Sequence, residues 1–474
     1  MSLTCTKSRF RAPNMNRRDW LHIGGLSFIG LSSAELARMR AEADPDSPAA
    51  RHRGNSCVFI FLFGGPSHID LWDMKPNSPE SIRGEFQPVS TNVPGIFLSE
   101  HLPRLARQMD QLCLLRSMHH GDPVHGTACS QMITGRPHRR PGSTDTFAPD
   151  DWPSLSALAM RYGRAAGHLP SSIVLPWYLM FPSQGRRIAG QTGALMGDRY
   201  NAFLVDEDPS RDDFKVPGLK PPAGFSPKRL RRREQLLRQI ESAGLSVPSG
   251  SVPQLVAGNY RSAFSMLNEP GVSAAFDLQK ENRSVRDRYG GHKFGQSLLL
   301  ARRLIEAGTS LVTVNWDDPT RDEKQSPFWD THHNNFERLK GHLAPPFDRA
   351  FSAFLQDLAD RGLLESTLVC VMGEFGRSPK IGRIVQNGMT AITGRDHWPY
   401  AFTVLMAGGG VRGGQVYGAS DKHGGFVKNN PITPPDLAAT MLQHLGIDRH
   451  LEYHAPLLDQ RYRISTGQPI LDLG

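Results

Sequence analysis

The chain has 474 residues, of which 39% are hydrophobic, and it contains 46 Gly and 36 Pro. This composition favours a globular protein with long loops over wholesale disorder, and the length fits one large α/β core as well as two domains. The formal charge of +9 is spread along the chain apart from one basic run at 228–238, which is typical of a solvated helix face, so there is no strong signal for nucleic-acid binding.

The N-terminal residues predict export. The segment Asn16–His22 resembles the twin-arginine export motif, because Arg17 and Arg18 precede a weakly apolar stretch. That stretch is shorter and more polar than the run of about 20 mainly apolar residues that spans a membrane. We therefore expect residues 1–46 to be a twin-arginine-type signal and linker, the mature protein to lie in the periplasm or at the cell surface, and no membrane span to remain after signal removal. An amphipathic first helix with a chance Arg pair is the alternative.

Beyond residue 47, apolar runs of strand length alternate with segments of helical periodicity. The expected strands lie at 57–63, 310–316, 366–373 and 401–410, and the expected helices at 295–308, 346–362 and 434–446. Continuous apolar runs are typical of parallel strands that are covered on both faces. This βαβ order predicts an α/β fold with a doubly wound, mainly parallel sheet flanked by helices. We expect one domain at 47–474, with a helical and loop insertion at about 200–290 that selects the substrate.

Acids and histidines accompany the expected strands. In an open parallel sheet, ligands bind beyond the carboxyl ends of the strands, where these side chains would meet. The candidate metal ligands are Asp70, Asp330, His332, His333, Glu374, Asp396 and His397. A set of this kind without cysteine favours Zn²⁺ or Mn²⁺ where imidazoles dominate, and Mg²⁺ or Ca²⁺ where carboxylates do; we place Zn²⁺ or Mn²⁺ first. Taken singly, each also has a structural interpretation: Asp70 as a helix cap, Glu374 as a partner of Arg377, and His397 as a packed histidine.

Several motifs together carry a family resemblance. They are FGGPSHIDLWDMKP, HGTACSQMITGRP, WDTHHNNF, GEFGRSP, GRDHWP and GGVRGGQVYGASD. With them the chain resembles the bacterial domain-of-unknown-function 1501 family, which looks like a branch of the alkaline phosphatase and sulfatase superfamily. The resemblance implies an alkaline-phosphatase-like fold, one or two metal ions at the carboxyl edge of the sheet, and hydrolysis of phosphate or sulfate esters by in-line attack.

The resemblance also implies where the metal ions bind. Asp330, His333 or His332, and His397 match the residues that hold one ion. Asp70 and Glu374 stand near the positions that hold a second ion, although Phe375 replaces the histidine expected beside Glu374.

The nucleophile is open at this stage. Thr134-Gly135-Arg136 resembles a sulfatase motif whose nucleophile lies nine residues earlier, and that position holds His125. His125 is then either a metal ligand or a nucleophile, while Thr127 is our first choice of nucleophile and Ser130 another. Arg377 is the expected ligand of the non-bridging ester oxygens, with Arg395, His119 and His120 as alternatives.

Three functions fit these observations. The first is an exported metal-dependent hydrolase of phosphate or sulfate esters, which would act on an anionic ester such as a sulfated or phosphorylated polysaccharide. The second is a non-catalytic, metal-stabilised relative that binds anionic glycans. The third is a phosphodiesterase or nuclease that uses metal-activated water and needs no protein nucleophile.

Overall fold

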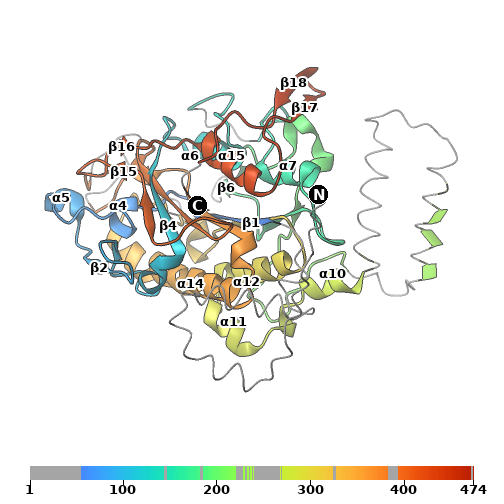
Figure 1. Ribbon diagram of the computed structural model, residues 1–474, viewed down its shortest axis with the longest axis horizontal. Coiled ribbons are helices and arrows are strands. Elements are labelled where there is room, and N and C mark those ends of the chain that lie inside the picture. The colour runs from blue at the N-terminus through green and yellow to red at the C-terminus, as the bar shows by residue number, and fades with distance from the viewer. Residues whose placement is uncertain are drawn as a thin grey trace, which may run out of the picture.

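The structure is a computed structural model that describes residues 55–142, 147–181, 185–219, 269–323, 327–382, 393–470 and 473, with a few residues between 228 and 267 (Figure 1). The expected export signal at 1–46 lies outside the described residues. So do part of the basic run at 228–238 and much of the expected insertion. Within the described part of the chain, none of the helices combines the length and apolar character that crossing a membrane requires.

The core is an eight-stranded sheet with the strand order β14-β4-β13-β10-β1-β9-β5-β8. Its strands are β1 (Ser56–Phe61), β4 (Leu112–Met118), β5 (Ser172–Leu175), β8 (Phe203–Leu204), β9 (Leu311–Asn315), β10 (Thr367–Met372), β13 (Phe402–Ala407) and β14 (Gln415–Tyr417). β1 pairs in parallel with both β9 and β10, whereas β13 is antiparallel to β10 and β4. The prediction of a mainly parallel sheet is confirmed.

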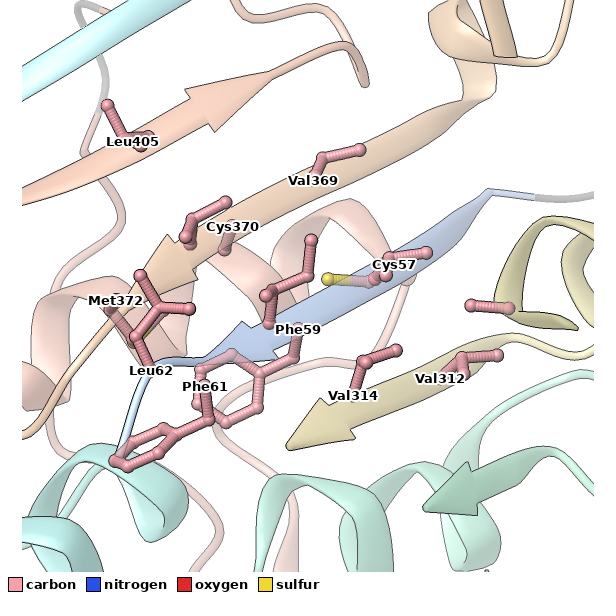
Figure 2. Packing of buried hydrophobic residues seen from close by; sticks show 14 of the residues in the cluster. Cys57, Phe59, Phe61, Leu62, Val312, Val314, Val369, Cys370, Met372 and Leu405 are labelled. Atoms are coloured by element: carbon pink, nitrogen blue, oxygen red, sulfur yellow. The ribbon is translucent and has the colours of Figure 1, made fainter. Parts of the chain in front are cut away.

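The central strand β1 explains why this sheet forms where the sequence is most apolar. Every residue of β1 is buried, and Figure 2 shows its side chains packed with those of β9 and β10. Since successive side chains of a strand point to opposite faces, Phe59 and Ile60 pack into opposite layers. Burying an aromatic or branched side chain of this size stabilises the fold by roughly 1.5–3 kcal/mol.

Helices cover both faces of the sheet (Figure 1). On one side lie α10 (Pro270–Ala275), α11 (Arg283–Tyr289), α12 (Lys293–Glu306) and α14 (Ala344–Asp360), and on the other α6 (His125–Thr134), α7 (Leu155–Tyr162) and α15 (Pro434–His444). α12 packs against β9 and α14, and α15 packs against α6 and β1. The helices predicted at 295–308, 346–362 and 434–446 are confirmed as α12, α14 and α15.

Short elements extend the loops between these strands and helices. The helices are α4 (His68–Leu71), α5 (Glu80–Arg83) and α13 (Asn335–Arg338), and the paired strands are β2 (Pro88–Ser90) with β3 (Phe97–Ser99), β6 (Met180–Phe181) with β7 (Arg186–Arg187), β11 (Gly376–Arg377) with β12 (His397–Trp398), β15 (Ala419–Ser420) with β16 (Val427–Asn429), and β17 (Glu452–Ala455) with β18 (Gln460–Arg463). The pair β11–β12 joins two of the polar motifs, because Arg377 lies opposite His397.

The turn that follows β1 is built on two glycines with positive φ, Gly64 at +112° and Gly65 at +78°. A Cβ at Gly64 would overlap the backbone nitrogen of Asp330 and lie 2.7 Å from the carbonyl carbon of Trp329. A Cβ at Gly65 would lie 2.6 Å from the ring of Phe375. Two loops from other strands therefore rest directly on this turn, which needs glycine both for its conformation and for space.

We expect Gly64→Ala to destabilise the protein more than Gly95→Ala. Gly95 also has a positive φ, +85°, but no atom lies within 4 Å of its added Cβ, so this control isolates the conformational cost of about 1–3 kcal/mol. Crowding against Asp330 and Trp329 adds about 1–3 kcal/mol more at Gly64. Urea unfolding of both variants measures the two free energies; equal losses of stability would contradict the close approach at Gly64.

Candidate metal centre

Four side chains converge at the carboxyl edge of the sheet: His125, Asp330, His332 and His397. One ligand atom from each lies within 4.8 Å of the other three. The carboxylate of Asp330 lies at the middle, with Oδ2 3.2 Å from Nε2 of His125, and Oδ1 3.0 Å from Nε2 of His332 and 3.4 Å from Nε2 of His397. Nε2 of His332 and Nε2 of His397 are 2.9 Å apart. The imidazoles therefore all direct the same ring nitrogen toward one carboxylate.

These residues come from segments that are far apart in the chain. His125 is the first residue of α6, which follows β4; Asp330 and His332 lie in the loop after β9. His397 lies in β12, shortly before β13, and because β13 is antiparallel it begins at the edge where β10 ends. The prediction that polar side chains would meet at the carboxyl edge of the strands thus describes the observed arrangement.

The loop of Asp330 and the segment that leads to His397 are fixed to each other. The backbone N–H of Arg395 donates to the carbonyl of Thr331 at 3.1 Å. A Cβ at Gly394 would overlap the carbonyl oxygen of His332, so only glycine allows the two segments to pass this closely. His332 and His397 are thereby held together by the backbone as well as by their own side chains.

Each imidazole also has an acceptor facing its other nitrogen. Nδ1 of His125 lies 2.5 Å from Glu374 Oε1, and Nδ1 of His397 lies 2.7 Å from the carbonyl of Pro123. Nδ1 of His332 lies 3.6 Å from Asp396 Oδ1. The partners of His125 and His397 are at hydrogen-bond distance; they orient the rings and would keep the proton on Nδ1 when Nε2 binds a metal ion, as in the histidines of metal sites.

The donor set fits a divalent metal ion. Imidazole Nε2 atoms and a carboxylate oxygen, converging with oriented rings, are what a tetrahedral site for such an ion requires. His125, Asp330, His332 and His397 are the residues that would hold it. The side chains of His125 and Asp330 are each 13% exposed, whereas those of His332 and His397 are 4% exposed, so the centre faces solvent on the side of His125 and Asp330.

The charged groups of the centre shift one another's pKa. Burial raises the pKa of Asp330, but His332, Arg377 and His125 outweigh it and hold that pKa well below its ordinary range. Burial lowers the pKa of His125, but Asp330 and Glu374 outweigh it and raise it to about 9. Burial and the nearby charge of His125 lower the pKa of His397 to about 3. At neutral pH His125 is therefore an imidazolium, whose two N–H groups face the carboxylates of Glu374 and Asp330.

Arg377 contacts the centre through the carboxylate of Asp330. Its guanidinium is fully buried, with Nε donating to the carbonyl of Gly65 at 2.9 Å and Nη1 to the carbonyl of Arg395 at 3.1 Å. Nη2 donates to the carbonyl of Gly64 and to Asp330 Oδ1, the latter at 2.5 Å. We expected Arg377 to bind the non-bridging oxygens of an ester, but these contacts direct it to Asp330, which it positions.

Three further candidate ligands lie beside the four converging side chains. Both oxygens of Glu374 accept the N–H of Gly64, at 3.0 and 3.2 Å, and Glu374 also faces Nδ1 of His125, so it orients that imidazole. Asp396 accepts the N–H of His397 at 2.8 Å and faces His332. His333, next in the chain to His332, does not join the converging group.

Asp70 requires a correction. The sequence suggested a ligand of a second ion, but the carboxylate is fully buried and forms a two-point ion pair with Arg395, at 2.8 Å for both contacts. Ser67 and Asn335 donate to the same carboxylate at 2.6 and 2.8 Å. Since its oxygens are taken by protein donors, Asp70 serves as the buried partner of Arg395 and lies outside the converging group.

The sequence left His125 as either a metal ligand or a nucleophile. Its place in the converging group favours the role of metal ligand. Thr127, our first choice of nucleophile, is fully buried within α6, where its hydroxyl donates to the carbonyl of Val124 at 3.3 Å. The carbonyl of Pro123 is a part of the site that sequence reasoning missed. Every residue has a backbone carbonyl, so the identity of residue 123 gives no sign of this role. The only signal in the sequence is that Pro123 lies two residues before His125.

Aromatic rings enclose His125 on its other sides. Ring centroids of Phe63, Phe375 and Phe181 lie 5.7, 5.0 and 6.3 Å from that of the imidazole. Phe63 and Phe375 are buried, and Phe181 of β6 is half-buried. The low polarity of this wall strengthens the electrostatic interactions of the centre.

Fold and site together define an α/β protein with a candidate divalent-metal centre at the carboxyl edge of its sheet. The model of the family described as "Protein of unknown function (DUF1501)" matches residues 54–473, and the chain belongs to this family. The family expected from the motifs is thus confirmed. Among curated proteins, none matches the chain.

Several solved structures are similar to this chain. Ps i-CgsB in complex with k-i-k-neocarrahexaose has a TM-score of 0.39 at 11% identity, over 84% of this chain and 73% of that chain. The PsFucS1 sulfatase from Pseudoalteromonas sp. has a TM-score of 0.38 at 12% identity, over 88% and 72%. The phosphonate monoester hydrolase SpPMH from Silicibacter pomeroyi has a TM-score of 0.32 at 10% identity, over 83% and 73%.

Metal uptake should release the proton that His125 holds. With a pKa of about 9 in the metal-free centre, the apparent association constant should rise about tenfold per pH unit between pH 7 and 8.5. Competition with a chromophoric chelator, corrected for the chelator's own protonation, measures this slope. Glu374→Gln is the matched control, because losing one carboxylate lowers the pKa of His125 and flattens the dependence. An affinity of the wild type that does not change with pH would contradict the charged state of His125.

Proposed function

We propose that this protein is a metal-dependent hydrolase of phosphate or sulfate esters. The observation that carries the proposal is the convergence of Asp330 with the Nε2 atoms of His125, His332 and His397, within 4.8 Å of one another. Because nitrogen donors dominate this set, Zn²⁺ or Mn²⁺ suits it better than Mg²⁺ or Ca²⁺. When bound, such an ion supplies a Lewis acid for the charge that develops on ester oxygens and lowers the pKa of water.

The surrounding residues keep this centre in one arrangement. Arg377 holds Asp330, and Glu374 holds His125 through Nδ1, so that the donor atoms need no rearrangement during a reaction. Phe63 and Phe375 exclude water behind His125. A substrate would approach from the side on which His125 and Asp330 are exposed.

We further propose that water attacks the ester directly. The hydroxyl of Thr127 is buried and bonded within its own helix, and none of the four converging side chains carries a hydroxyl or a thiol. Direct attack by water would suit phosphate monoesters, phosphate diesters and sulfate esters alike. The same observation favours the second candidate function, a non-catalytic relative in which the metal stabilises a module that binds anionic glycans.

The setting of the reaction follows from the sequence. The twin-arginine-type motif at 16–22 supports export to the periplasm or the cell surface. An anionic polysaccharide ester is a substrate that an exported hydrolase would meet there. We propose a single catalytic domain at 47–474, with the segment at about 200–290 contributing to substrate choice.

Metal content should depend on the converging side chains. Mass spectrometry of the folded wild type should find about one divalent ion per chain, and Asp330→Ala and His397→Ala should remove it. The matched control is the exposed pair His454 and Asp459, whose replacement by alanine should leave the metal content unchanged. A folded wild type that takes up none of Zn²⁺, Mn²⁺, Mg²⁺ and Ca²⁺ would refute the centre.

Activity should follow the metal content. With 4-nitrophenyl phosphate, bis(4-nitrophenyl) phosphate and 4-nitrophenyl sulfate as substrates, Asp330→Ala should lower kcat/KM at least about 10³-fold for the ester that the wild type hydrolyses. Thr127→Val, which removes the hydroxyl but keeps the shape, should change kcat/KM by less than about threefold. Loss of activity in Thr127→Val with metal retained would identify Thr127 as the nucleophile. Metal without turnover of any ester would favour the binding module.

A further inference from the structure

A pair of aromatic rings is exposed beside the segment that carries His397. Tyr400 is 40% and Phe426 is 56% exposed, and their ring centroids lie 5.7 Å apart with planes inclined by 33°. Trp398, which is only 5% exposed, contacts both rings, with centroid distances of 5.1 Å to Tyr400 and 5.7 Å to Phe426. We call Trp398, Tyr400 and Phe426 the aromatic cluster. Two large exposed rings on a buried third are an unusual use of a surface unless something binds them.

The aromatic cluster is held in place. Nε1 of Trp398 donates to the carbonyl of Gly425 at 2.5 Å. Asp421 accepts the N–H groups of His423, Gly425 and Phe426 at 2.9, 2.9 and 3.1 Å, and these bonds close the loop that presents Phe426. A ligand would therefore meet rings that are already positioned, so little conformational entropy is lost on binding.

The chain connects this cluster to the metal centre by a short, extended segment. Trp398 follows His397 directly in β12, and because successive side chains of a strand point to opposite faces, the imidazole enters the centre while the indole packs under the exposed rings. Tyr400 comes three residues after His397, a span of at most about 11 Å. The aromatic cluster and the metal centre are therefore neighbours along one segment of the chain.

Positive charge accompanies the rings. Lys422 and Lys428 are exposed and belong to the same loop and strand as Phe426. Phe426 directly precedes β16, and Lys428 is the second residue of that strand. The carboxylate of Asp421 accepts hydrogen bonds from three backbone N–H groups of its own loop. The surface combines apolar rings with cations.

We propose that the aromatic cluster is a docking subsite for an anionic glycan, in which the rings pack against the apolar faces of sugar rings and Lys422 and Lys428 meet sulfate or phosphate groups. The connection to the metal centre rests on the proposed function, but the binding itself does not require turnover. A glycan fits better than a single-stranded nucleic acid, because the latter needs a continuous basic groove along its backbone, whereas the cations named beside these rings are two lysines, Lys422 and Lys428.

The test measures the affinity of the full chain for dextran sulfate, with neutral dextran and a 20-nucleotide deoxythymidine oligomer as comparison probes. Tyr400→Ala and Phe426→Ala should each raise the Kd for dextran sulfate about 3–10-fold, and the double variant should raise it further. Phe97→Ala is the matched control, because Phe97 is also an exposed aromatic residue, at 46%, and it should bind as the wild type does. Neutral dextran should bind much more weakly than dextran sulfate to every variant.

Three results would overturn the inference. They are wild-type affinity in both aromatic variants, a preference for the deoxythymidine oligomer that the same variants abolish, and a change from dimer to monomer in Phe426→Ala that accounts for the altered affinity. Circular dichroism and size-exclusion chromatography of each variant check folding and mass.

The variant Asp330→Ala separates this inference from the proposed function. It should lose the metal and any turnover, while Tyr400→Ala and Phe426→Ala should still raise the Kd for dextran sulfate in the Asp330→Ala background, because the aromatic cluster does not touch Asp330. Binding through the cluster without hydrolysis of any ester would refute the proposed function alone. Hydrolysis together with unchanged binding in Tyr400→Ala and Phe426→Ala would refute the docking subsite alone.

Discussion

The largely buried charge of Asp330 is the constraint on which the site depends. A carboxylate with little access to water is costly unless cations and donors surround it, and here three imidazoles and the guanidinium of Arg377 contact it. Arg377 in turn is held by the carbonyl groups of Gly64 and Gly65, which follow the fully buried strand β1. The guanidinium of Arg377 thus links the turn after β1 to Asp330 and fixes the position of that carboxylate.

Within the described part of the chain, two arginines each hold a carboxylate near this edge of the sheet. Arg395 occupies the carboxylate of Asp70, and Arg377 occupies the space beside Asp330. A guanidinium is a permanent charge that no change of solution removes, whereas a bound ion exchanges with its surroundings. Where a protein needs positive charge at a fixed point, an arginine on a rigid strand supplies it without the need to acquire anything from outside.

The sequence predicts most of the scaffold and part of the site. Strands such as β1 are continuous apolar runs, and ligands gather beyond the carboxyl ends of parallel strands, so the order of residues along the chain is enough to assign Asp330 to this edge. His397 precedes its strand and reaches the same edge only because β13 is antiparallel to its neighbours. The role of Asp70 is not predictable in this way, because its partner lies 325 residues away and spacing along the chain does not encode that pairing. Likewise, the sequence leaves open whether Thr127 faces the centre, since only the rotation of α6 decides it.

The antiparallel direction of β13 affects which residues can reach the metal centre. Because β13 runs against its neighbours, the chain reaches the carboxyl edge while entering a strand, and His397 is delivered there ahead of β13. In a sheet with only parallel strands, the residues that precede each strand lie at the far edge. Reversing one strand therefore adds a second way of recruiting side chains to the same place, from segments upstream as well as downstream of a strand. A centre built in this way draws on local sequence that a purely parallel topology would leave at the opposite end of the molecule.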